Sequence, residues 1–132
     1  MLSPSAYAWE FTPGAPCKLS HSGPDATVEL TYDPTLPLYT IAIMPKKPFE
    51  PAPVFAVIFE GPRGLTISTN RHQLSDGGRK LTVNDTGFGN VLNGLQFNRT
   101  ATAELGQRRL SFPLDNAAPA VAAFRECAPP VS

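Results

Sequence analysis

Apolar and polar residues alternate along much of this 132-residue chain, and the alternating runs end at clusters of proline and glycine. In residues 26–32 every second side chain is apolar, which places the apolar ones on one face of an extended strand. Residues 38–44 follow the same rule, whereas residues 53–60 are apolar on both faces, as in a central strand. The pattern predicts β-structure for most of the chain.

Turn residues divide the rest of the chain into short segments. Residues 53–70 read as a hairpin around the turn at 60–64, and residues 101–114 read as a second, final hairpin. The remaining strands are predicted at residues 7–12 and 79–84.

Two segments carry helical rather than strand patterns. A short helix is predicted near residues 90–96, and a longer, alanine-rich one near 116–127, with Asp115 as its N-cap. In the second helix, apolar residues three positions apart form one face that ends at Cys127. The predicted fold is a single domain over residues 1–132, mainly β: an antiparallel β-sandwich with these two helices.

The two cysteines, Cys17 and Cys127, lie near opposite ends of the chain. Their spacing matches neither a zinc site nor a redox CxxC pair, which leaves two separate buried thiols or a disulfide. We favour the disulfide, which would place the protein in the periplasm or outside the cell. Residues 1–4 lack the basic and apolar regions of a signal peptide, so the alternatives are a cytosolic chain or the mature part of an exported one. No apolar run is long enough to predict a membrane span.

Charge is balanced over the whole chain but not along it. The 11 basic and 11 acidic side chains argue against nucleic acid or an anionic membrane as a partner bound through overall charge. Residues 1–62 carry three lysines and six carboxylates, whereas residues 63–132 carry eight basic and five acidic groups. The basic residues that crowd two loops and their strand ends are Arg63, Arg71, His72, Arg79 and Lys80. They predict a face for an anionic protein or polysaccharide; the alternative is a solvated sheet edge protected by charge.

The glycine-rich stretch at residues 84–98 invites comparison with phosphate-binding loops. A P-loop needs lysine and serine or threonine where this chain has Leu95 and Gln96, and the third glycine comes too late for a dinucleotide loop. We therefore predict no nucleotide and no other cofactor, and expect Gly87 and Gly89 to supply positive φ in a turn.

Residues of catalytic type are present but do not form a known motif. His72 has Ser75, Asp76 and Asp85 nearby in sequence, which is the basis of an alternative interpretation as a small hydrolase. His72 and His21 lack the spacing of a metal site. We predict no catalytic residues and no metal.

Residues 45–53 contain four prolines and are expected to form an extended, exposed connection. We favour a stiff spacer; the alternative is a docking loop with Phe49 as its apolar anchor. The docking interpretation would make the protein a secreted inhibitor.

Residues 91–105 and 108–127 resemble the C-terminal part of invasion-associated locus B-like bacterial proteins. The positions that carry the resemblance are Leu114, Asn116, Ala120, Phe124 and Cys127, although Asp115-Asn116 replaces an expected glycine. The resemblance implies a small bacterial β-sandwich protein that is exported and has no established enzymatic role, and it transfers no catalytic residue. We thus predict a periplasmic or secreted, non-enzymatic binding or envelope-associated domain.

Overall fold

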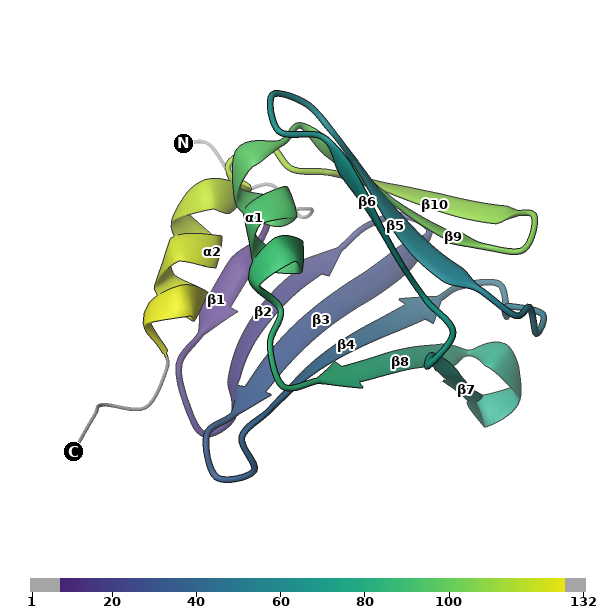
Figure 1. Ribbon diagram of the computed structural model, residues 1–132, viewed down its shortest axis with the longest axis horizontal. Helices are drawn as coiled ribbons and strands as arrows, with labels where there is room; N and C mark the ends of the chain where they lie inside the picture. The colour runs from purple at the N-terminus through teal and green to yellow at the C-terminus, as the bar shows by residue number, and fades with distance from the viewer. Residues whose placement is uncertain (1–7, 128–132) are drawn as a thin grey trace.

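Residues 8–127, the part of the chain described by the computed structural model, form two facing antiparallel sheets and two α-helices (Figure 1). The first sheet has the order β1 (Glu10–Thr12), β2 (Cys17–Ser22), β3 (Ala26–Asp33), β4 (Leu38–Pro45), β8 (Lys80–Asp85), β7 (Gln73–Ser75). The second has the order β10 (Arg108–Pro113), β9 (Thr100–Leu105), β5 (Phe55–Glu60), β6 (Leu65–Thr69). The helices are α1 (Gly89–Phe97) and α2 (Ala117–Glu126), and a 3₁₀ turn, η1, spans Asp76–Gly78. The predicted sandwich is confirmed.

The core lies between the two sheets, where the inward faces of the alternating strands meet. In the register of the first sheet, Leu30 on β3 lies opposite Leu19 on β2 and Ile41 on β4, and all three are buried. Each fully buried aliphatic side chain of this kind contributes roughly 1.5–3 kcal/mol through removal from water. Alternation in the sequence therefore fixes which face of β3 points inward.

The two helices pack against each other at one end of the sandwich (Figure 1). The guanidinium of Arg125 on α2 donates to the side-chain oxygen of Gln96 on α1 at 2.9 Å. Gly94 allows α1 to lie directly on β5, because a Cβ at this position would overlap the ring of Phe59.

Asn98, at the end of α1, ties this helix to the β5–β6 turn. Its Oδ1 accepts from the main-chain N–H of Arg63 at 2.9 Å, and its Nδ2 donates to the Arg63 carbonyl at 2.9 Å and to the Gly94 carbonyl at 3.0 Å. The oxygen and the nitrogen of this buried amide thus both have hydrogen-bond partners. These bonds hold the turn that precedes β6 in place.

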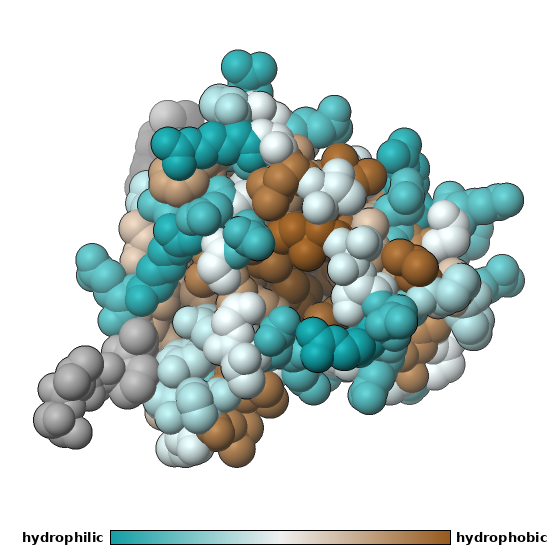
Figure 2. Space-filling model, in the orientation of Figure 1, coloured by the Kyte–Doolittle hydropathy of each residue, from teal (hydrophilic) through white to brown (hydrophobic). Residues whose placement is uncertain are grey.

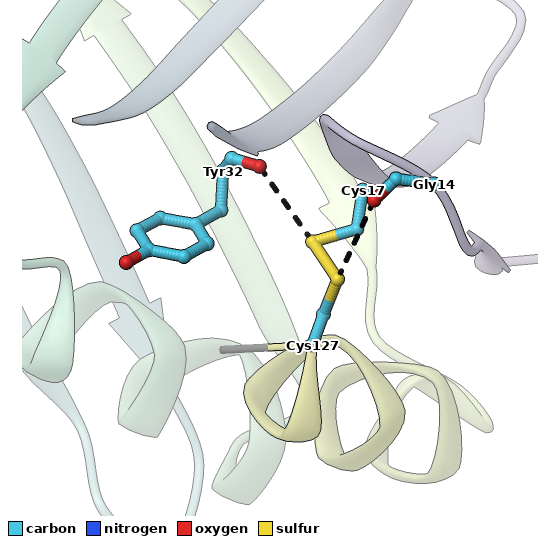
Figure 3. Close-up of a disulfide and its surroundings, with 4 residues drawn as sticks. All are labelled: Gly14, Cys17, Tyr32 and Cys127. Atoms are coloured by element: carbon cyan, nitrogen blue, oxygen red, sulfur yellow. Dashed lines mark hydrogen bonds between the residues drawn. A yellow bond between two sulfur atoms is a disulfide. The ribbon is translucent and has the colours of Figure 1, made fainter. Parts of the chain in front are cut away.

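The predicted Cys17–Cys127 disulfide is present (Figure 3). It joins the start of β2 to the residue after α2, with a Cα–Cα distance of 6.4 Å. Figure 3 shows the bond between the main-chain oxygens of Tyr32 and Gly14, which lie 3.7 and 3.9 Å from the two sulfurs. The disulfide therefore fixes the C-terminal helix to the first sheet.

Some elements differ from the sequence-based prediction. Strands β2 and β7 were not predicted: β2 places the charged or polar residues Lys18, Ser20 and Ser22 on one face and a histidine on the other, and β7 has three residues. The first predicted strand covers Glu10–Thr12 only, and residue 7 lies outside the described residues.

The N-cap of the C-terminal helix is Asn116, so the prediction of Asp115 is wrong. Asn116 has φ 60°, in the left-handed region that asparagine adopts more readily than most residues. The chain adopts a left-handed conformation at the residue just before the helix. A capping rule based on side-chain type does not predict this backbone conformation.

Candidate functional site

A solvent-open cleft of about 440 Å³ lies between the sheets, on the side where β6 and β8 face each other. Figure 2 shows it as a hollow with a hydrophobic floor inside a mostly polar rim. The apolar residues that line it are Ile41, Phe55, Val57, Ile67, Val83, Phe88 and Val91. The polar residues that line it are Ser68, Thr69, Arg71, Asp85 and Asn90.

The cleft follows from the way the chain passes between sheets. Strand β6 is an edge strand whose hydrogen-bonded neighbour is β5, and residues 70–72 then cross to β7 in the other sheet. β6 and β8 therefore belong to different sheets and do not pair. On β6, half-buried Leu65 and Ile67 alternate with exposed Thr66 and Ser68, so apolar side chains face a partly uncovered interior.

Two opposite charges stand at the mouth of the cleft. The Arg71 guanidinium lies 3.5 Å from the Asp85 carboxylate, and their side chains are 72% and 39% exposed. The main-chain N–H of Arg71 donates to the Thr69 hydroxyl at 3.0 Å, which positions the residue just after β6. An exposed pair of this type contributes about 0–1 kcal/mol, so an anionic ligand group can replace Asp85 as the partner of Arg71 at little cost.

The glycine-rich loop forms the opposite rim. Gly87 and Gly89 do not adopt positive φ, so that prediction is wrong. A Cβ at either position would meet no atom within 4 Å, and both residues line the cleft. Their lack of side chains keeps this rim low and the cleft accessible.

Between these glycines, Phe88 closes the end of the cleft. It is buried, and its ring packs 5.3 Å from that of Tyr39, which in turn lies 4.4 Å from Tyr32. Burial, together with the neighbouring Tyr32, raises the pKa of the Tyr39 hydroxyl above its ordinary value of 10.0. This end of the cleft is thus backed by uncharged aromatic side chains.

The structure does not gather the predicted basic residues at one point. Arg63 lies in the β5–β6 turn, with its guanidinium 4.9 Å from the centre of the Phe97 ring. Arg71 lies at the other end of β6, a five-residue strand of roughly 17 Å. Arg79 and Lys80 are exposed at the start of β8. Of the predicted set, Arg71 lines the cleft.

Two further arginines on the second hairpin have partners of their own. Arg109 pairs with Glu104 at 2.7 Å. Arg108 donates to the Pro48 carbonyl at 3.1 Å and lies over the Phe49 ring. Both belong to β10, in the four-stranded sheet, and neither lines the cleft.

The remaining member of the basic set, His72, is half-buried rather than solvated. Its Nε2 is 2.8 Å from the Ala52 carbonyl oxygen, and its ring lies 6.2 Å from that of Phe55. Asp85, one of the carboxylates considered as its catalytic partner, is paired with Arg71. Within residues 8–127, His72 thus contacts a main-chain carbonyl and an aromatic ring.

His21, the other histidine, is buried in the core, where it stacks on Trp9 at 4.9 Å. Within residues 8–127 no group of three or more histidine, cysteine or carboxylate residues is placed to hold a metal ion.

The proline-rich segment differs from its prediction in one respect. Phe49 is 4% exposed, so it is not a surface anchor for a partner. Its N–H donates to the Gly78 carbonyl at 2.8 Å, which fastens the segment to η1. The exposed residues here are Lys46, Lys47, Pro48 and Glu50.

Sequence reasoning missed the cleft itself. The alternation identifies Ile67 and Val83 as inward-facing, but a buried and an incompletely covered position have the same pattern. A weak signal was present: exposed Thr66 and Ser68 alternate with the apolar residues of β6, and the crossing segment that follows is rich in polar residues.

Comparison with models of known protein families gives no match, and comparisons with curated proteins and with solved structures give none either. The resemblance to invasion-associated locus B-like proteins stays a prediction. In the described part of the chain, neither helix has the length and apolar character needed to cross a membrane.

Proposed function

We propose that this protein is an exported, non-enzymatic binding domain that holds an amphipathic small molecule in the cleft between its sheets. The observation that carries the proposal is the open apolar cleft with an arginine at its mouth. Its volume of about 440 Å³ lies within the range of roughly 300–1,000 Å³ found for small-molecule sites. The disulfide supports export, since such bonds persist in oxidising compartments.

The lining favours binding over catalysis. Of the described residues that line the cleft, Arg71 and Asp85 are the ionisable ones, and they pair with each other at the mouth. The floor consists of aliphatic and aromatic side chains, which attract an apolar group without reacting with it. The anionic partner predicted from the charge pattern enters this proposal as the head group of the ligand, next to Arg71.

The apolar contact is tested with the fluorescent probe anilinonaphthalene sulfonate (ANS) and a matched pair of variants. Ile67 lines the cleft, whereas the adjacent Thr66 is exposed on the same strand. We expect saturable binding of ANS to the native protein and an affinity at least tenfold lower for Ile67→Gln, because burying an isoleucine contributes about 1.5–3 kcal/mol. Thr66→Gln is expected to bind as the native protein does.

Thermal unfolding of both variants checks that each remains folded. Equal ANS binding by the two variants, or equal loss in both, would contradict the cleft as the site. Val83→Phe, which narrows the cleft without adding a polar group, gives a second measurement of the same effect.

The charge contact is tested separately at Arg71. We expect Arg71→Gln to weaken ANS binding about threefold to tenfold at low salt, because a charge-assisted contact is lost and Asp85 is left to repel the sulfonate. The salt dependence of binding should become flatter. Arg79→Gln is the control, since Arg79 is exposed and does not line the cleft. Native salt dependence in Arg71→Gln would show that the head group lies elsewhere.

A further inference from the structure

An inner cavity of about 30 Å³ lies in the core behind the cleft. Its walls are apolar side chains from both sheets and α1, among them Trp9, Leu95, Ala103 and Phe112. The indole N–H of Trp9 donates to the Pro113 carbonyl at 2.8 Å, and Pro113 does not line this cavity. The cavity therefore offers apolar contacts to whatever enters it.

Three residues line both the cleft and the inner cavity: Ile41 on β4, Val57 on β5 and Val91 on α1. Because they border both volumes, a chain passing from the cleft into the inner cavity would run between these three side chains. Ile41 is buried, while Val57 and Val91 are half-buried. The apolar lining of the cleft thus adjoins that of the inner cavity, which Trp9 also lines.

The size of the inner cavity limits what can reach it. An engineered cavity of about 150 Å³ holds a benzene ring, whereas a single water needs a probe volume of about 10–15 Å³. At about 30 Å³, the inner cavity fits the end of an unbranched hydrocarbon chain and excludes a ring.

We propose that the ligand is a straight-chain carboxylate, with its terminal methyl group in the inner cavity and its carboxylate at Arg71. The inference rests on the proposed function and names its ligand class. The charged pair Arg71–Asp85 is exposed at the mouth, whereas the lining of the inner cavity is apolar, which favours entry of the ligand with its hydrocarbon end first. A planar guanidinium such as that of Arg71 can contact a ligand carboxylate through two parallel hydrogen bonds.

Chain length is the first test, using isothermal titration of octanoate, decanoate and dodecanoate into the intact, oxidised protein. Each added methylene that becomes buried is expected to tighten Kd about fourfold, until the inner cavity is filled. A dodecanoate analogue with a phenyl group at its far end is expected to bind at least tenfold more weakly than a straight chain of matched length. Equal affinity for these two would overturn the inference.

Orientation is the second test, with Trp9 as the reporter, since it is the one tryptophan of the sequence. Bromine quenches indole fluorescence at short range. Dodecanoate brominated at its terminal carbon is expected to quench Trp9 on binding, whereas the isomer brominated next to the carboxylate is expected to bind without quenching. Quenching by both isomers to the same extent would overturn the proposed orientation.

The third test fills the inner cavity with a larger side chain. Ala103 lines this cavity, and Ala103→Val adds methyl groups to it. We expect this variant to keep octanoate binding and to lose the gain from decanoate to dodecanoate. Ala42→Val is the matched control, because Ala42 is also a buried strand residue but lines neither cavity. Thermal unfolding shows whether each variant is folded, and an unchanged length series in folded Ala103→Val would overturn the inference.

The ANS and carboxylate series separate this inference from the proposed function. ANS is a ring compound that fits the outer cleft but not the inner cavity, so its binding tests the cleft alone. ANS binding with no chain-length dependence overturns the straight-chain inference and leaves the binding function standing. Failure of both ANS and the carboxylates to bind overturns both.

Discussion

Removing the Cys17–Cys127 disulfide is expected to lower the free energy of unfolding by about 4–5 kcal/mol. The two cysteines are 110 residues apart, and in the chain-entropy model a closed loop of this length strongly restricts the unfolded chain. The double variant Cys17→Ala/Cys127→Ala and the reduced native protein should both show the loss as a lower urea midpoint. Each is compared with the oxidised native protein at the same pH.

The structure also indicates which element should lose stability first when the disulfide is removed. The disulfide fixes the end of α2 to the start of β2, and α2 packs on β1 and β2. Hydrogen exchange in α2 should therefore accelerate more than exchange in the β9–β10 hairpin. A double variant with the native midpoint would show that packing alone holds the helix. Intact mass before and after reduction checks that the bond forms in protein made under oxidising conditions.

The second large effect is expected at Gly78, which is buried and has φ +87°. A Cβ at this position would overlap the carbonyl oxygen of Phe49 and displace the segment whose N–H donates to the Gly78 carbonyl. We expect Gly78→Ala to destabilise the fold by about 3 kcal/mol or more, of which roughly 1–2 kcal/mol comes from the left-handed backbone.

Gly77→Ala is the matched control for this prediction. Gly77 also has positive φ, +65°, but its Cβ would meet no atom within 4 Å. It should show the backbone cost of about 1–2 kcal/mol without the collision. Urea unfolding of the two variants measures the difference, and equal midpoints would mean that the Phe49 segment moves aside freely. Neither residue lines the cleft, so ANS binding should be unchanged in folded protein.

The sequence was most informative where local geometry and burial agree. Residues 26–32 and 38–44 have apolar side chains at every second position, and both became adjacent strands of the first sheet. The hairpin at 53–70 formed as β5 and β6, since a turn with two glycines separates two strongly apolar or alternating runs. The helix predicted near 116–127 delivers Cys127 to Cys17, because apolar residues spaced three apart define its inner face.

The errors arose where a residue's role depends on a distant partner. Phe49 has no local pattern that separates an exposed anchor from a core residue, and its burial depends on Gly78 and Arg108. Strand β2 contains a charged residue and a histidine, and the ring stacking of His21 on Trp9 is visible only in three dimensions. Gly87 and Gly89 were expected to satisfy a backbone requirement, whereas their effect is to leave space.

The cleft shows most clearly what each level of description determines. By itself, the sequence determined a mainly β protein, the inward faces of its central strands and the C-terminal helix, and it favoured a disulfide between the two cysteines over two separate thiols. Only the tertiary structure decided that Ile67 and Val83 face an open cleft and that Arg71, alone of the predicted basic set, lines it. The physical reason is that periodicity specifies which face of a strand is apolar, whereas the distance to the opposite sheet decides whether that face is covered.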